Sequence, residues 1–238
     1  MTPDTAIQRG VFFLVDRRFT SPVLVVGLGR FGSSLALSLI EGGREVMALD
    51  ASADRVQHYA DRLTHVMQVD TTDEEAMRQI GASDFDQAIV AIGTDIESSV
   101  LTTVLLADFG ISEIWAKAIS QEHGRILERI GAHHVVYPEA DMGARVAHLV
   151  SGAMLDYIQF DDEFALAKLV ADETLGSKPL GQLGLRARHG ITVVGVRPPE
   201  GSFTYADSDT VIAPGTLIAV AGRIADVDRF AQTLSDHT

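Results

Sequence analysis

The chain has 238 residues, a formal net charge of −14 and no cysteine. The lack of cysteine excludes disulfides, thiolate catalysis and cysteine-ligated zinc, and the acidic balance disfavours the basic face that grips a nucleic-acid backbone. No apolar run approaches the ~20 residues of a membrane-spanning helix, and no signal-peptide pattern opens the sequence. We therefore expect a soluble, cytoplasmic protein with no nucleic-acid partner.

Short β-branched runs alternate with helical patterns from Val23 to about Ser151. This alternation predicts an α/β fold with a doubly wound parallel Rossmann sheet, whose ligand lies beyond the carboxyl ends of the strands. A capping-box pattern from Thr72 to Glu75 is expected to open the third helix. The expected strands are Val23–Val26, Glu45–Asp50, His65–Asp70, Gln87–Ala91, Glu113–Ala116 and His134–Tyr137. The expected helices are Ser33–Glu41, Ala53–Leu63, Asp73–Ile80, Ile96–Phe109, Gln121–Ile130 and Met142–Leu149.

The pattern changes after Gly152, where short strands and proline-glycine turns predict a second, smaller α+β domain. Its expected strands are Phe164–Val170, Ile191–Arg197 and Leu217–Ala221, and its expected helix is Ala225–Leu234. The predicted organisation is an N-terminal extension at 1–21, a Rossmann domain at 22–151, a linker at 152–160 and the small domain at 161–238. A unit of this size gains stability by pairing with a copy of itself.

A glycine-rich turn, Gly27-Leu28-Gly29-Arg30-Phe31-Gly32, joins the first expected strand to the first expected helix. The first glycine permits the tight turn, the second lets backbone N–H groups approach phosphate, and the third lets the helix pack against the strand. Asp50 closes the second strand, where it can accept hydrogen bonds from ribose hydroxyls. Asp70 and Gly93 lie at or past other strand ends. The pattern predicts a nucleotide site; the alternative is a glycine turn whose site is vestigial.

Four further segments accompany this turn in a fixed order: Val90–Gly93, Ile114–Ala118, Pro138–Gly143 and Leu185–Gly190. Together they resemble the cytosolic regulatory subunits of the Ktr/Trk potassium-uptake systems, which are built from RCK domains with TrkA-N and TrkA-C type lobes. The resemblance covers Pro22 to about Gln232. It implies a non-enzymatic, ATP/ADP-controlled gating subunit, peripheral on the inner face of the cell membrane. Its homodimers would assemble into an octameric ring beneath a membrane-embedded potassium transporter.

The resemblance also implies the ligands and their contacts. ATP or ADP, and in some members NAD(H), would bind the N-lobe, with Arg30 on a terminal phosphate and the adenine against Asp70 and Thr71. Val69 stands where many members have glycine, which puts the shape of the adenine edge in doubt. The implied nucleotide contacts are Gly27, Gly29, Arg30, Phe31, Gly32, Asp50, Asp70, Thr71, Gly93 and Lys117.

Two residues are matched to other ligands, and the first of them has a simpler interpretation. Glu139 corresponds to a glutamate that helps bind a divalent cation, Mg²⁺ or Ca²⁺, at the dimer interface; alternatively it only begins a helix, where an acid is favoured. Arg186 corresponds to an arginine that binds cyclic di-AMP in some relatives. Lys117 either touches a phosphate or the partner subunit, or is simply solvated. His133 and His134 are expected to be structural, because neighbours on a strand point to opposite faces.

Two other functions remain open at this point. An NAD-dependent oxidoreductase or an NADH-sensing regulator would also use the glycine turn, and Asp50 suits NAD better than NADP. An enzyme needs a set of acid and base side chains near the nicotinamide. The last stretch of about 75 residues supplies no convincing set of this kind. A redox-sensing repressor is disfavoured by the acidic balance and by the lack of an evident helix-turn-helix pattern.

Overall fold

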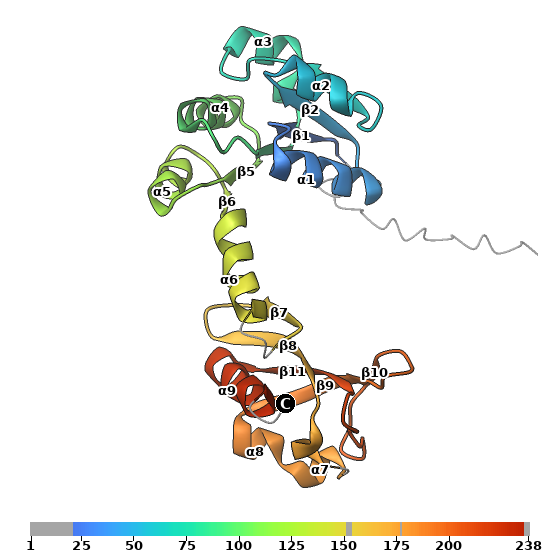
Figure 1. Ribbon diagram of the computed structural model, residues 1–238. Helices are drawn as coiled ribbons and strands as arrows, with labels where there is room; N and C mark the ends of the chain where they lie inside the picture. Colours follow the sequence, from blue (N-terminus) through green and yellow to red (C-terminus); the bar gives the residue numbers. More distant parts are fainter. Residues whose placement is uncertain (1–20, 151–153, 177, 236–238) are drawn as a thin grey trace, which may run out of the picture. The chain divides into compact units, whose positions relative to one another are not determined.

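The computed structural model describes residues 21–150, 154–176 and 178–235. Contacts group the chain into two compact units, one ending at Pro138 and the other beginning at Glu139 (Figure 1). Almost all of the predicted N-terminal extension lies outside the described residues. Each unit is described by itself below.

The first unit is built on a parallel six-stranded sheet with the strand order β3-β2-β1-β4-β5-β6. This order reverses direction between β1 and β4, where a doubly wound sheet opens a crevice for ligands. Its strands are β1 (Val23–Val26), β2 (Val46–Asp50), β3 (His65–Gln68), β4 (Gln87–Val90), β5 (Glu113–Lys117) and β6 (His134–Val136). Its helices are α1 (Arg30–Glu41), α2 (Ala53–Tyr59), α3 (Glu74–Gln79), α4 (Ile96–Asp108) and α5 (Gln121–Arg129), with a 3₁₀ turn η2 (Ala82–Asp84).

Both faces of this sheet carry an apolar core. Val23 and Val25 pack with α1 and α2 on one face, whereas Leu24 and Val26 pack with α3, α4 and α5 on the other. The whole of β1 is buried, as its run of four apolar residues predicts for a central parallel strand. The predicted α/β fold is therefore confirmed for this unit.

The sequence predicts the wrong capping residue for α3. Asp73, not Thr72, caps the helix, because its carboxylate accepts hydrogen bonds from the N–H groups of Glu75 and Ala76. The Thr72 hydroxyl instead donates to Asp70 Oδ1 at 2.7 Å. Aspartate is as good a helix cap as threonine, so neighbouring candidates compete for the same orphan N–H groups.

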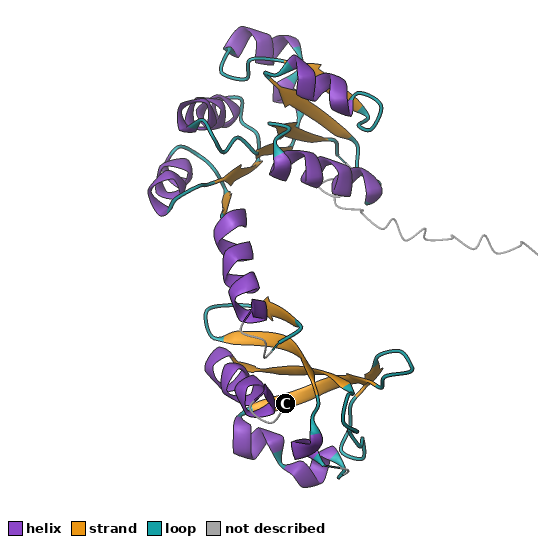
Figure 2. Cartoon of the chain, in the orientation of Figure 1, coloured by secondary structure: helices purple, strands orange, loops and turns teal. Residues whose placement is uncertain are grey.

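The second unit is built on a five-stranded antiparallel sheet with the order β10-β9-β11-β8-β7. Helix α9 packs against β8 and β11, with Val227, Phe230 and Leu234 buried in the core (Figure 2). Its strands are β7 (Asp156–Gln159), β8 (Phe164–Val170), β9 (Ile191–Arg197), β10 (Thr204–Tyr205) and β11 (Leu217–Arg223). Its helices are α6 (Pro138–Val150), α7 (Leu180–Leu183), α8 (Leu185–His189) and α9 (Ile224–Ser235), with a 3₁₀ turn η3 (Glu173–Leu175). The smaller α+β domain is thus confirmed.

Three sequence expectations differ from the structure here. The expected linker at 152–160 contains β7, which pairs antiparallel with β8 and buries Tyr157; its polar ends conceal the strand in the sequence. Helix α6 begins at Pro138 rather than Met142, since proline suits the first helical turn, where its missing N–H is not needed. Contacts also group α6 with the second unit, whereas the sequence places it in the Rossmann domain.

Within the described residues, no helix combines the length and the apolarity required to cross a membrane.

Candidate nucleotide-binding site

The glycine turn lies between β1 and α1 at the carboxyl edge of the first sheet. Gly27 has φ +96°, a conformation that side chains disfavour, and its N–H donates to Leu49 O at 2.7 Å. The neighbouring Ala91 N–H donates to Val26 O, also at 2.7 Å. These bonds hold the turn to the ends of β2 and β4, so its position is set by the sheet.

The other two glycines of the turn have opposite surroundings. A Cβ at Gly32 would lie 1.9 Å from Gly27 O and 2.8 Å from Ala91 Cβ, so α1 sits directly on the strand ends. A Cβ at Gly29 would meet no atom within 4 Å. The side of the turn at Gly29 is therefore open, as the close approach of a phosphate requires.

Helix α1 begins without a side-chain cap. Gly29 is its N-cap residue, makes no side-chain hydrogen bond, and no acidic residue occupies the first turn. By contrast, α2, α4 and α5 are capped by Ser52, Asp95 and Ser120. The N–H groups at the start of α1 are thus left without a side-chain acceptor, and they carry the positive end of the helix dipole. Arg30 is exposed at this end.

The Asp50 side chain is hydrogen-bonded to the glycine turn and does not project into solvent. Its side chain is only 4% exposed, and Oδ2 accepts the Leu28 N–H at 2.6 Å. Oδ1 accepts the Ser52 N–H at 2.8 Å, and Arg55 Nη1 donates to Oδ2 at 2.8 Å. The predicted ribose acceptor therefore lies next to the glycine turn, and it also holds the turn in place.

Lys117 brings a positive charge to the same edge. It ends β5, is buried, and its Nζ lies 5.8 Å from the centre of the Phe31 ring. A Cβ at Gly93 would come within 3.0 Å of that Nζ, so the glycine leaves room for the ammonium group. Gly93, Lys117 and Phe31 are thus assembled at the switch point, and the interpretation of Lys117 as a solvated lysine is wrong.

The two residues expected at the adenine have different settings. Thr71 is buried, and its hydroxyl shares a 2.9 Å hydrogen bond with the Thr102 hydroxyl, which also donates to Thr71 O at 3.3 Å. Both its side chain and its carbonyl group are therefore held by α4. Asp70 is exposed, and hydrogen bonds from the Thr72 hydroxyl and then the Thr72 N–H lower the pKa of its carboxyl.

Glu139 and Arg186 belong to the second unit, apart from the turn. Glu139 lies in the exposed first turn of α6. Across the described parts of the chain, no group of three or more histidine and acidic side chains is placed to hold a metal ion. Arg186 is exposed in α8, and its Nε donates to the Thr192 hydroxyl at 3.0 Å.

Sequence reasoning missed the Arg55–Asp50 pair and the burial of His123. Arg55 follows Asp50 by five residues in the first turn of α2, a spacing that could have suggested the pair. His123 is buried at the start of α5, and its Nε2 has no hydrogen-bond partner. Burial lowers the pKa of His123 because the charged imidazolium is poorly solvated there.

The fold and the glycine turn define this protein as a Rossmann-type α/β unit joined to a small antiparallel unit. The sequence profile of the TrkA-N domain matches residues 23–138, and that of the TrkA-C domain matches residues 165–235. The chain belongs to the Ktr/Trk family of potassium-uptake proteins that carry these two domains.

Relatives from two bacteria match over nearly their full length. Ktr system potassium uptake protein C of Bacillus subtilis (strain 168) is 39% identical over 207 residues, which cover 87% of this chain and 94% of the relative. Protein A of the same system and organism is 35% identical, covering 87% and 93%. Ktr system potassium uptake protein A of Vibrio alginolyticus is 32% identical, also covering 87% and 93%.

Solved structures show the same fold. The RCK domain of GsuK superposes with a TM-score of 0.62 at 18% identity, covering 90% of this chain and 48% of that one. The GsuK channel bound to NAD superposes with a TM-score of 0.60 at 18% identity, covering 87% and 38%. The chain thus spans half or less of those longer proteins.

Proposed function

We propose that this protein is the nucleotide-binding regulatory subunit of a potassium-uptake system and gates a membrane-embedded transporter subunit. Its kinship with Ktr proteins along their whole length supports the class. The single observation that carries the nucleotide site is the open side of the turn at Gly29. Asp50 accepts the Leu28 N–H of the same turn, and Lys117 Nζ lies 5.8 Å from the centre of the Phe31 ring. Uncapped helix N–H groups and a buried ammonium attract a negatively charged phosphate, and a carboxylate accepts hydrogen bonds from a ribose.

The ligands of this site are adenine nucleotides. ATP and ADP present the same ribose and diphosphate, and NADH shares the adenosine half. Isothermal calorimetry and thermal-shift titration with ATP, ADP and NADH test this directly. A ligand at about a hundred times its Kd should stabilise the fold by roughly 2.7 kcal/mol. If none of the three raises the melting temperature or releases heat, the nucleotide site is not functional.

The nucleotides control transport by shifting the protein between conformations. ATP and ADP differ at the terminal phosphate, which we assign to Arg30, so they stabilise different conformations by that difference in binding energy. Potassium flux through the transporter subunit, reconstituted with this protein, should respond differently to ATP and ADP. Identical flux with both nucleotides would contradict gating. Mixing the protein with NADH and candidate substrates should give no dehydrogenase turnover, whereas steady turnover would favour the oxidoreductase alternative.

The proposed assembly is a homodimer that builds an octameric ring. Helix α6 exposes Met142, Val146 and Val150 at helical spacing, and these residues are 54%, 44% and 80% exposed. Such a stripe favours a second copy as its cover. Light scattering with ATP tests this assembly, and a stable 25.6 kDa monomer would refute it.

Two further ligands are proposed for the second unit. Glu139 would hold Mg²⁺ or Ca²⁺ together with its symmetry mate, because two facing carboxylates repel each other unless a cation lies between them. Arg186 would bind cyclic di-AMP through its guanidinium. Calorimetry with each ligand, in wild-type protein and in the corresponding alanine variants, tests both assignments.

A further inference from the structure

Most of the acceptor positions of the Asp50 carboxylate are already occupied by donors from the protein. Oδ2 accepts two donors, the Leu28 N–H at 2.6 Å and Arg55 Nη1 at 2.8 Å, and Oδ1 accepts the Ser52 N–H at 2.8 Å. An ionised carboxylate has about four acceptor positions. One position on Oδ1 therefore remains for an incoming hydroxyl.

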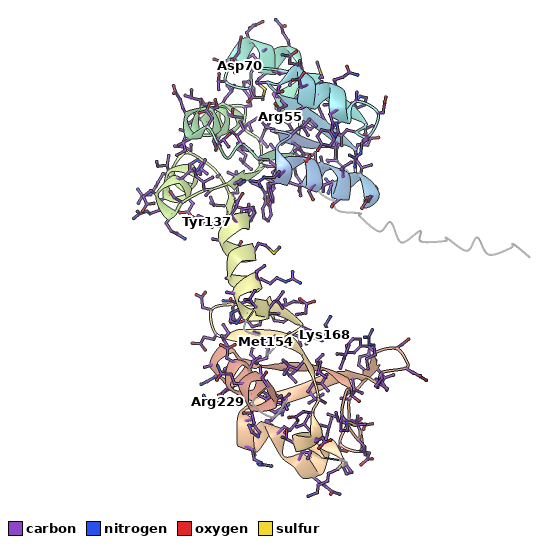
Figure 3. The ribbon with its side chains drawn as sticks, in the orientation of Figure 1. Arg55, Asp70, Tyr137, Met154, Lys168 and Arg229 are labelled. Atoms are coloured by element: carbon purple, nitrogen blue, oxygen red, sulfur yellow. The ribbon has the colours of Figure 1, made fainter. Side chains whose placement is uncertain are left out.

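A ribose offers two neighbouring hydroxyls to such an acid. The first can take the remaining position on Oδ1, but the second can bind only if one existing donor leaves. Leu28 N–H belongs to the glycine turn and Ser52 N–H belongs to the turn that begins α2, so both are fixed by the backbone. Arg55, which is labelled in Figure 3, is different. Its long side chain is 53% exposed, so water can solvate the freed guanidinium.

We propose that Arg55 is a latch on the ribose-binding carboxylate, a specificity-determining residue that competes with the 2′,3′-diol of the nucleotide. This inference rests on the proposed nucleotide site. Without ligand the guanidinium is hydrogen-bonded to Asp50, and a diol displaces it when it binds both carboxylate oxygens. The latch lowers the affinity for every ligand with an intact ribose by the free energy of the Arg55–Asp50 pair. It does not lower the affinity for a ligand that lacks both hydroxyls, because that ligand leaves the Arg55–Asp50 hydrogen bond intact.

The test compares Arg55→Ala with wild type by calorimetry, using ADP and 2′,3′-dideoxy-ADP as probes. A half-exposed ion pair contributes little, so ADP should bind the variant about two- to five-fold tighter than it binds wild type. The dideoxy probe should show no such gain. Both probes carry the same phosphates, so the lost positive charge affects them equally and cancels in the comparison.

Arg62→Ala is the matched control. Arg62 is exposed in the turn that follows the same helix, and its Cζ lies 5.6 Å from the centre of the Tyr59 ring. Within the described part of the chain it forms no hydrogen bond or ion pair with Asp50, so this variant removes an equal charge without touching the latch. It should change the affinities for the two probes in parallel.

Three results would overturn the proposal in distinguishable ways. Weaker ADP binding in Arg55→Ala would make Arg55 a direct ligand contact, and an equal gain for both probes would make it a general charge effect. Either result would leave the nucleotide site intact. If wild type binds neither ADP, ATP nor NADH, the proposed function falls, and the latch falls with it.

Discussion

Replacing Gly32 by alanine should destabilise the first unit without any ligand being involved. The added Cβ would lie 1.9 Å from Gly27 O and 2.8 Å from Ala91 Cβ. Both neighbours are held by the sheet, the first through the Gly27 N–H bond to Leu49 O and the second by the hydrogen bond between Ala91 N–H and Val26 O. Helix α1 must therefore move outward by roughly an ångström, which is overpacking of the kind that costs about 1–3 kcal/mol.

A smaller effect opposes this loss, because alanine is favoured over glycine within a helix by about 1 kcal/mol. The contact with backbone oxygen is far inside the normal limit, so we expect the clash to exceed that gain. The net loss should lower the melting temperature by roughly 2–4 °C for each kcal/mol. Circular dichroism during heating and urea unfolding, both without nucleotide, measure it.

Gly29→Ala is the matched control in the same turn. A Cβ there meets no atom within 4 Å, and Gly29 has φ −66°, which alanine adopts readily. Stability should change by less than about 1 kcal/mol, while nucleotide affinity should fall because the methyl group occupies the open side. A Gly32→Ala variant as stable as wild type would refute the close-packing argument. A Gly29→Ala variant that binds ADP normally would place the phosphates elsewhere.

Four further predictions concern charged and titratable groups. Asp50→Ala should weaken ATP, ADP and NADH alike by about ten- to a hundred-fold and should also destabilise the fold, because the buried Leu28 N–H loses its acceptor; calorimetry showing unchanged affinity would remove Asp50 from the site. Arg30→Ala should reduce affinity for ATP more than for ADP, whereas equal losses would assign it to the shared diphosphate. Glu139→Gln should abolish any enhancement of ATP-driven flux by divalent cations while preserving nucleotide binding, and persistent cation dependence would contradict the metal site. His123 has a lowered pKa, so the unfolded state binds its proton more readily, and stability should fall as the pH drops below about 6.5. Urea unfolding of His123→Phe between pH 5 and 8 should show a shallower acid slope, by up to about 1.4 kcal/mol per pH unit; an unchanged slope would show that other groups control acid stability.

The Rossmann unit could be predicted closely because its signals are local. The apolar run of β1, the glycine turn and the acid at the end of β2 each follow from backbone preferences or from burial on both faces of a sheet. β7 could not be predicted, since a four-residue strand with polar ends has too little pattern and gains its stability from pairing with β8. The cap of α3 was misassigned because Thr72 and Asp73 both satisfy the local rule, and the choice depends on where each side chain finds its partner.

By itself the sequence determined the order of strands and helices in the first unit, the glycine turn and the carboxylate beside it. Those features depend on each residue's own φ and ψ preferences and on the spacing of apolar side chains, which neighbours in the chain already express. Only the tertiary structure decided that Lys117 is buried beside Gly93 and Phe31, and that Asp50 is bonded to both Leu28 and Arg55. Lys117, Gly93 and Phe31, like Asp50 and Leu28, are far apart along the chain and meet because parallel strands end at one edge of the sheet. Arg55 is near Asp50 in sequence, but its hydrogen bond to the carboxylate is visible only in the structure. An unpaired charge is costly to bury, so a charged group that is buried at this edge pairs with a neighbouring group.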